Sequence, residues 1–215
     1  MRSSSAFALL ILLACGLPAE GALAQDASSD NPAAATADRI GAAAAALQAD
    51  EPPLIGKARL DKLFSDLKRE RNPRAAERIA NFIREEWGRS GSASIDLMMQ
   101  WSAKAMDDKK FDTALDFLDQ VTMLAPDYAE GWNRRATLHY MMNSYAKAMA
   151  DIDRTLRLEP RHFGALSGMA AIFKAYDRKE AALDAYARVL AVYPMLREAQ
   201  EEMATLADDL AGEGI

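Results

Sequence analysis

The fold is decided by the stretch AEGWNRRATLHYMMNSYAKAMADIDRTLRLEP at residues 129–160. Its apolar side chains recur with the period of two consecutive helices, and no part of it alternates as a β-strand would. The same arrangement continues on both sides, because two residue types return every 34 positions. These residues are Pro126, Pro160 and Pro194, and Ala80, Ala114, Ala148 and Ala182. A shared interval for two residue types predicts a repeated helix–turn–helix unit.

The middle unit resembles the tetratricopeptide repeat (TPR), a 34-residue unit with the pattern W-x2-L-G-x2-Y…A-x3-F…P. The residues that carry the resemblance are Trp132, Ala136, Tyr145, Ala148, Ile152 and Pro160. The units before and after it match less closely, with Ser102 and Ala170 at the small position. Arg135 stands where the family has Leu, and His139 where it has Tyr. We expect these departures to loosen individual contacts without shifting the repeat.

The resemblance covers about 100 residues and implies an all-α, right-handed TPR solenoid. Three repeats are expected at about 95–128, 129–162 and 163–196, with a capping helix at 197–211. Small residues allow two helices to approach closely, and Pro ends each second helix because it has no N–H to donate. Residues 57–93 predict an N-terminal helical hairpin, with Pro73 at the start of its second helix. This hairpin is either a degenerate repeat or a simple cap.

The first 24 residues have the layout of a secretory signal peptide. Arg2 precedes an apolar run from Ala6 to Leu17, and a small-residue cleavage site ends at Ala24. The apolar core of about 12 residues is too short to cross a bilayer, which takes ~20 helical residues. We therefore expect export to the periplasm and cleavage after Ala24.

A second way of processing this segment stays open. The run Leu12-Leu13-Ala14-Cys15 resembles the lipobox of bacterial lipoproteins, in which the Cys is lipidated. In that case Cys15 would anchor the chain in the cell envelope, and a membrane partner is expected only then. The alternative without a special function is that Cys15 is one more apolar residue of the signal peptide.

Residues 25–56 are rich in Ala, Ser, Asp and Pro, and they predict a disordered linker. Within it, residues 33–49 have high helix propensity, with Ile40 and Leu47 on one face. Transient docking of this stretch onto the folded part is therefore the alternative.

Composition excludes several function classes. The chain has 26 basic and 32 acidic side chains and a net charge of −6. Such a balance argues against a nucleic-acid binder, which needs a basic face to displace counterions. One Cys and two His do not make the usual metal cages, and no phosphate-binding, dinucleotide-binding or hydrolase motif occurs. We expect no cofactor, no metal and no enzymatic activity. His139 is expected to pack, and His162 to cap a helix or contact solvent.

Charge is unevenly distributed along the chain. Residues 57–93 hold ten basic and six acidic side chains, whereas residues 195–215 hold one and six. A basic cluster is expected at the turn of the hairpin, formed by Lys68, Arg69, Arg71 and Arg74. Three interpretations stay open: an anionic partner, a solvated face, or head-to-tail self-association of the basic and acidic ends.

In the family, the first helix of each repeat lines a concave groove that accepts peptides or helices. Carried onto this sequence, the resemblance implies a partner-binding groove that includes Met99, Asn133, Arg134, Thr137, Tyr140, Met141 and Lys174. The Met residues of this set would form an adaptable apolar surface, unless they pack inside the solenoid.

The family's readers of acidic C-termini use a clamp of Lys, Asn and Arg. The matching positions hold Met99, Ala103, Arg134, Gly164 and Gly168, so only one of them is basic. This composition argues against recognition of a terminal carboxylate in that mode. The leading hypothesis is an exported TPR adaptor or scaffold that binds a protein or peptide in its groove. The alternative is a lipid-anchored assembly component of the cell envelope, tethered through Cys15.

Overall fold

The computed structural model describes residues 56–213. The signal peptide, Cys15, the cleavage site at Ala24 and residues 25–55 of the expected linker lie outside this range. The described residues form nine helices and no strand, so the all-α prediction is confirmed. The helices are α2 (Lys57–Arg69), α3 (Pro73–Trp87), α4 (Ala93–Asp107), α5 (Phe111–Leu124), α6 (Ala129–Met141), α7 (Tyr145–Leu158), α8 (Phe163–Ala175), α9 (Lys179–Val192) and α10 (Arg197–Glu213).

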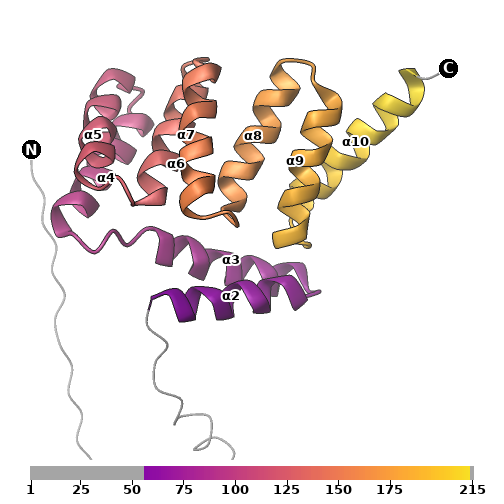
Figure 1. The fold of residues 1–215 in the computed structure, drawn as a ribbon, viewed down its shortest axis with the longest axis horizontal. Helices are drawn as coiled ribbons and strands as arrows, with labels where there is room; N and C mark the ends of the chain where they lie inside the picture. Colours follow the sequence, from indigo (N-terminus) through magenta and orange to yellow (C-terminus); the bar gives the residue numbers. More distant parts are fainter. Residues whose placement is uncertain (1–55, 214–215) are drawn as a thin grey trace, which may run out of the picture. The chain divides into compact units, whose positions relative to one another are not determined.

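Helices α4 to α9 form three antiparallel pairs, and α10 follows the last pair (Figure 1). The second helix of each pair ends at Leu124, Leu158 or Val192, two residues before the repeated Pro. The turn inside each pair holds a residue with positive φ, namely Lys109, Asn143 or Asp177. These three also lie 34 positions apart, so the repeat extends to the backbone conformation of the turn.

Small residues decide how closely the helices approach. Ala114, Ala148 and Ala182 are fully buried within their pairs. Between pairs, Gly131 of α6 meets α5 so closely that a Cβ there would lie 2.8 Å from Val121 Cγ1. Because a real Cβ does not fit at that distance, only Gly permits this approach of the two helices.

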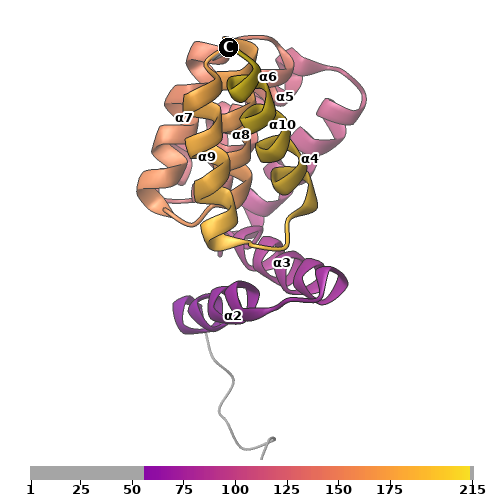
Figure 2. The same cartoon turned by 90° about the vertical axis from the view of Figure 1, so that its right-hand side faces the viewer.

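The hairpin of α2 and α3 packs across one end of α8 and α9 (Figures 1 and 2). Trp87 of α3 stacks on His162, with ring centroids 3.9 Å apart, and it also contacts Phe163 at the start of α8. Arg161 pairs with Asp61 of α2 at 2.7 Å and lies over the Phe64 ring. The hairpin therefore does not sit where a degenerate repeat stacked on α4 would lie.

Local residues fix where α3 begins and how the chain leaves the hairpin, and the apolar face of α3 fixes where the hairpin packs. Asn72 accepts hydrogen bonds from the backbone N–H groups of Arg74 and Ala75, and Pro73 occupies the first helical position. The loop from α3 to α4 passes through Gly91, whose φ of +80° suits Gly. Burial of the apolar face of α3 against Phe163, Leu166 and Tyr193 takes the place of stacking on α4.

Among the described helices, none combines the length and apolar character needed to cross a membrane.

Replacing Ala148 with Leu is expected to overpack the contact of α6 with α7 and to lower the free energy of unfolding by ~1–3 kcal/mol. Urea denaturation measures this change. Ala150→Leu is the matched control, because Ala150 is exposed on the same helix, and a change within about 0.5 kcal/mol is expected there. An unchanged stability of Ala148→Leu would contradict the helix register given above.

Candidate functional site

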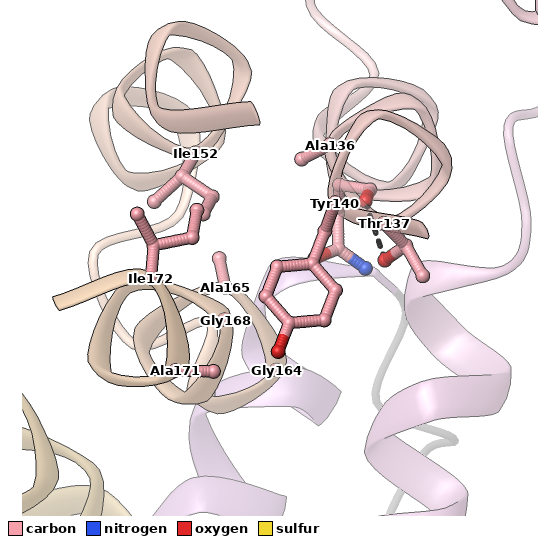
Figure 3. Close-up of a pocket in the computed structure, with 10 residues that line it drawn as sticks. Ala136, Thr137, Tyr140, Ile152, Gly164, Ala165, Gly168, Ala171 and Ile172 are labelled. Carbon is pink, nitrogen blue, oxygen red and sulfur yellow. Dashed lines mark hydrogen bonds between the residues drawn. The ribbon is translucent and has the colours of Figure 1, made fainter. Parts of the chain in front are cut away.

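A small hollow of about 110 Å³ lies between α6 and α8, with Ile152 of α7 at its floor (Figure 3). Apolar and small side chains make up most of its wall: Ala136, Ile152, Gly164, Ala165, Gly168, Ala171 and Ile172. Three polar residues of α6 complete it, namely Asn133, Thr137 and Tyr140. The Tyr140 ring extends from α6 toward α8 across the hollow (Figure 3). We call this site the α6–α8 pocket.

Two Gly residues of α8 keep the α6–α8 pocket open. A Cβ at Gly168 would lie 3.4 Å from Ile152 Cδ1, and one at Gly164 would lie 3.4 Å from His162 Cε1. Both distances are ordinary contacts, so neither Gly is required by packing. Their effect is to leave space that a longer side chain would fill.

The structure brings together three of the residues predicted for the groove: Asn133, Thr137 and Tyr140 all line the α6–α8 pocket. They follow one another at helical spacing on α6, and the Thr137 hydroxyl donates to the carbonyl oxygen of Asn133 at 3.0 Å. Tyr140 keeps 38% of its surface exposed, so its ring is accessible to a ligand.

The other predicted residues lie elsewhere. Met99 is only 7% exposed and packs in the core of the first repeat, as the alternative for the Met residues supposed. It also lines a separate hollow between α4 and α6 together with Arg134. Met141 is exposed at the end of α6 but does not line the α6–α8 pocket. Lys174 forms an ion pair with Glu202 of α10. Arg134 borders a neighbouring hollow, described next.

The neighbouring hollow, of about 190 Å³, lies between α3, α6 and α8. Arg84 and Trp87 of α3 line it together with Asn133, Arg134 and His162. Asn133 and Gly164 line both hollows, so the two sites adjoin each other. The contribution of α3 was not expected from the sequence, because no local pattern shows where the hairpin docks.

Glu130 is the acidic centre of this second hollow. Its carboxylate contacts Arg134 at 3.1 Å and His162 Nε2 at 3.2 Å. His162 Nδ1 accepts the backbone N–H of Ala165, so in neutral His162 the proton is on Nε2 and points to Glu130. Burial acts to raise the pKa of Glu130, but the hydrogen bond and charge of His162 and the charge of Arg134 outweigh it and lower that pKa below the usual value for Glu.

Arg135 corrects the expectation that it loosens the repeat. Its guanidinium makes two hydrogen bonds to the Asp151 carboxylate, at 2.9 and 2.8 Å, and it also binds Asp119 at 2.7 Å. Asp151 is buried, so this bidentate pair replaces an apolar contact between α6 and α7 with a charged one. His139 lies 3.9 Å from Asp151, and its burial lowers its pKa, which favours the neutral ring.

Within residues 56–213, no group of three His, Cys, Asp or Glu side chains is placed to hold a metal ion.

The paired helices and the hollows between first helices define a class, the helical-repeat solenoids with a groove along their first helices. A TPR repeat-containing protein of Rhizobium etli is 56% identical over 156 residues, which is 73% of this chain and 76% of that protein. The chain therefore belongs to the TPR family. No protein-family model matches it.

More distant similarities agree on the fold. The yeast Small glutamine-rich tetratricopeptide repeat-containing protein 2 (Saccharomyces cerevisiae) is 28% identical over 115 residues, which is 54% of this chain and 33% of the yeast protein. The first TPR of Spaghetti, solved bound to the HSP90 peptide SRMEEVD, aligns with a TM-score of 0.53 at 24% identity, over 56% of this chain and 95% of that one. The Sgt2 TPR domain of Aspergillus fumigatus gives a TM-score of 0.53 at 17% identity, over 57% and 83%.

Breaking the buried ion pair should be costly. Arg135→Leu is expected to lower the free energy of unfolding at pH 7 by about 3–5 kcal/mol, because Asp151 stays buried without its partner. The double variant Arg135→Leu/Asp151→Leu should regain most of that loss in urea denaturation, since an apolar pair fits the site. A double variant as unstable as the single one would show that the pair is not the cause.

Glu130 should make stability depend on pH. Its folded pKa lies below its unfolded value of about 4.3, so its contribution is complete above that value and is lost as pH falls through the folded pKa. Glu130→Gln is therefore expected to be less stable than the parent chain at pH 7, with the difference shrinking as the pH falls below about 4.3. Denaturation between these pH values measures it, with the exposed Glu85→Gln as control. A difference that is constant with pH would contradict this role.

Proposed function

We propose that this protein is an exported adaptor that binds a peptide or protein segment in the groove between α6 and α8. The observation that carries the proposal is the α6–α8 pocket, an apolar hollow bordered by the polar side chains of Asn133, Thr137 and Tyr140. A concave apolar site with a few polar groups at its edge is the usual form of a ligand-binding site. Its role is binding rather than catalysis.

The size and lining of the pocket favour a partner segment with an aliphatic side chain. The pocket's volume of about 110 Å³ and its lining of Ala, Gly and Ile side chains suit one aliphatic side chain. The Asn133 side-chain amide already donates to Glu130 at 2.9 Å. We therefore expect its carbonyl oxygen, together with the Tyr140 hydroxyl, to hydrogen-bond the polar backbone beside that anchor. The adjoining hollow with Arg84 and Arg134 would then hold a neighbouring polar or acidic residue of the same segment.

Two structural neighbours support a peptide partner. The first TPR of Spaghetti was solved with an HSP90 peptide, and TPR2B of yeast Sti1 (TM-score 0.51, 16% identity) in a complex with pHsp70. In this chain, the positions that match the family's carboxylate clamp hold Met99, Ala103, Gly164 and Gly168 in addition to Arg134. We therefore propose an internal segment anchored by an apolar side chain, and not a terminal carboxylate.

The proposed place of action is the periplasm, and it rests on the signal-peptide layout of residues 1–24. The alternative is a lipid anchor on Cys15, which would make the solenoid a tethered assembly platform. An N-terminus at Gln25 in the mature protein would support the first. Incorporation of labelled fatty acid that disappears in Cys15→Ser would support the second and contradict the first.

Filling the α6–α8 pocket should abolish binding. Gly168→Leu places a branched side chain into the space beside Ile152, and we expect affinity capture of the partner from an envelope extract to fall at least about tenfold. Asn133→Ala and Tyr140→Ala should each reduce it as well. Ala187→Leu, on an exposed position of α9, is the matched control. Undiminished capture by a folded Gly168→Leu variant, checked by circular dichroism, would contradict the site.

A further inference from the structure

The 34-residue repeat allows one face of α4 to be compared with the same face of α6 and α8. Three positions of α4 define this face: Leu97, Trp101 and Lys104. Their counterparts 34 residues later are Gly131, Arg135 and Leu138, and 68 residues later Ala165, Met169 and Ile172. We call the three positions of α4, together with Phe117 of α5, the α4 end face.

In the inner repeats this face is covered by the second helix of the preceding pair. Leu138 and Ile172 are 0% and 1% exposed, and Gly131 lies against Val121 of α5. Arg135 donates hydrogen bonds to Asp119 and Thr122 of the same helix. Helix α5 thus covers α6, and α7 covers α8 in the same way.

The α4 end face has no such cover among the described residues, because the α2–α3 hairpin packs on α8 and α9 instead. Leu97 is 41% exposed and Trp101 is 47% exposed. Trp101 and Phe117 contact each other, with ring centroids 5.4 Å apart, beside an open hollow of about 370 Å³. In the next repeat, the same two positions hold the ion pair of Arg135 and Asp151.

Helix α10, at the opposite end of the solenoid, has polar residues on its exposed surface. Helix α10 presents Glu201, Thr205 and Asp208 as exposed residues at the same helical spacing as the three positions of α4. A terminal repeat needs such a polar outer face for solubility. At the α4 end the exposed residues include Leu97 and Trp101 instead, and this apolar exposure indicates a contact surface.

We propose that the α4 end face is a self-association surface on which a second copy of this chain docks, end face to end face, about a two-fold axis. The second copy would cover the face with helices, as α5 covers α6 in the inner repeats, but here the same surface of both copies is used. A two-fold axis places the apolar centre of the patch on its own copy, whereas head-to-tail packing would set Leu97 and Trp101 against the acidic α10. At the edge of the face, Lys104 and Asp108 pair with each other at 3.6 Å, so their charges are matched within one copy.

Sedimentation equilibrium of the full chain over about 1–100 µM tests the proposal. We expect a monomer–dimer equilibrium, and in Trp101→Glu a dissociation constant raised at least about tenfold. Phe82→Glu is the matched control: Phe82 of α3 is as exposed as Trp101, at 47%, and its replacement should leave the dimer intact. Circular dichroism of both variants checks that they are folded.

Two further measurements separate this dimer from other associations. An apolar contact should persist in 1 M salt, where the Debye length is about 3 Å, whereas association of the basic and acidic ends should dissociate. Gly168→Leu should dimerise like the parent chain, because the α6–α8 pocket is a different surface. A chain that is monomeric throughout, a dimer lost in high salt, or association unchanged in Trp101→Glu would each overturn the proposal; the first result would leave the face to a partner of another sequence.

Discussion

The close approach of neighbouring helices at small residues is the constraint on which the rest of the structure depends. Ala114, Ala148 and Ala182 are fully buried within their pairs, and Gly131 leaves no room for a Cβ beside Val121. Because packed interiors tolerate little added volume, these positions set the distance between helices and therefore the register of every other contact. The hollow between α6 and α8 follows from the same register, since Gly164 and Gly168 leave it unfilled.

The repeat holds its backbone arrangement while one position changes its chemistry. One position on the first helix of each pair and one on the second are related by the 34-residue repeat. In the three repeats these two positions hold Trp101 and Phe117, then Arg135 and Asp151, then Met169 and Ala185. An aromatic pair, an ion pair and an apolar pair therefore occupy equivalent places. The charged version is stable there because α5 adds Asp119 and Thr122 to the guanidinium, and the aromatic version is the one left at an uncovered end.

The α2–α3 hairpin contributes side chains to the groove of the solenoid. Its Trp87 lies on His162, which caps α8 and hydrogen-bonds Glu130 of α6. The hairpin thus adds Arg84 and Trp87 to the wall of the hollow that adjoins the α6–α8 pocket. Because the hairpin packs on α8 and α9, it does not cover the α4 end face. The position of the hairpin therefore affects both the hollow beside the α6–α8 pocket and the α4 end face.

The sequence by itself determined the helical class and the 34-residue period, because these depend on local spacing of Ala, Pro and apolar residues. It also indicated Asn133, Thr137 and Tyr140 as neighbours, since they share one face of a single helix. Only the tertiary structure decided that Met99 is in the core, that Arg135 is paired and that the hairpin lies on α8 and α9. Those outcomes depend on contacts between residues 16 to about 100 positions apart, which no local pattern encodes.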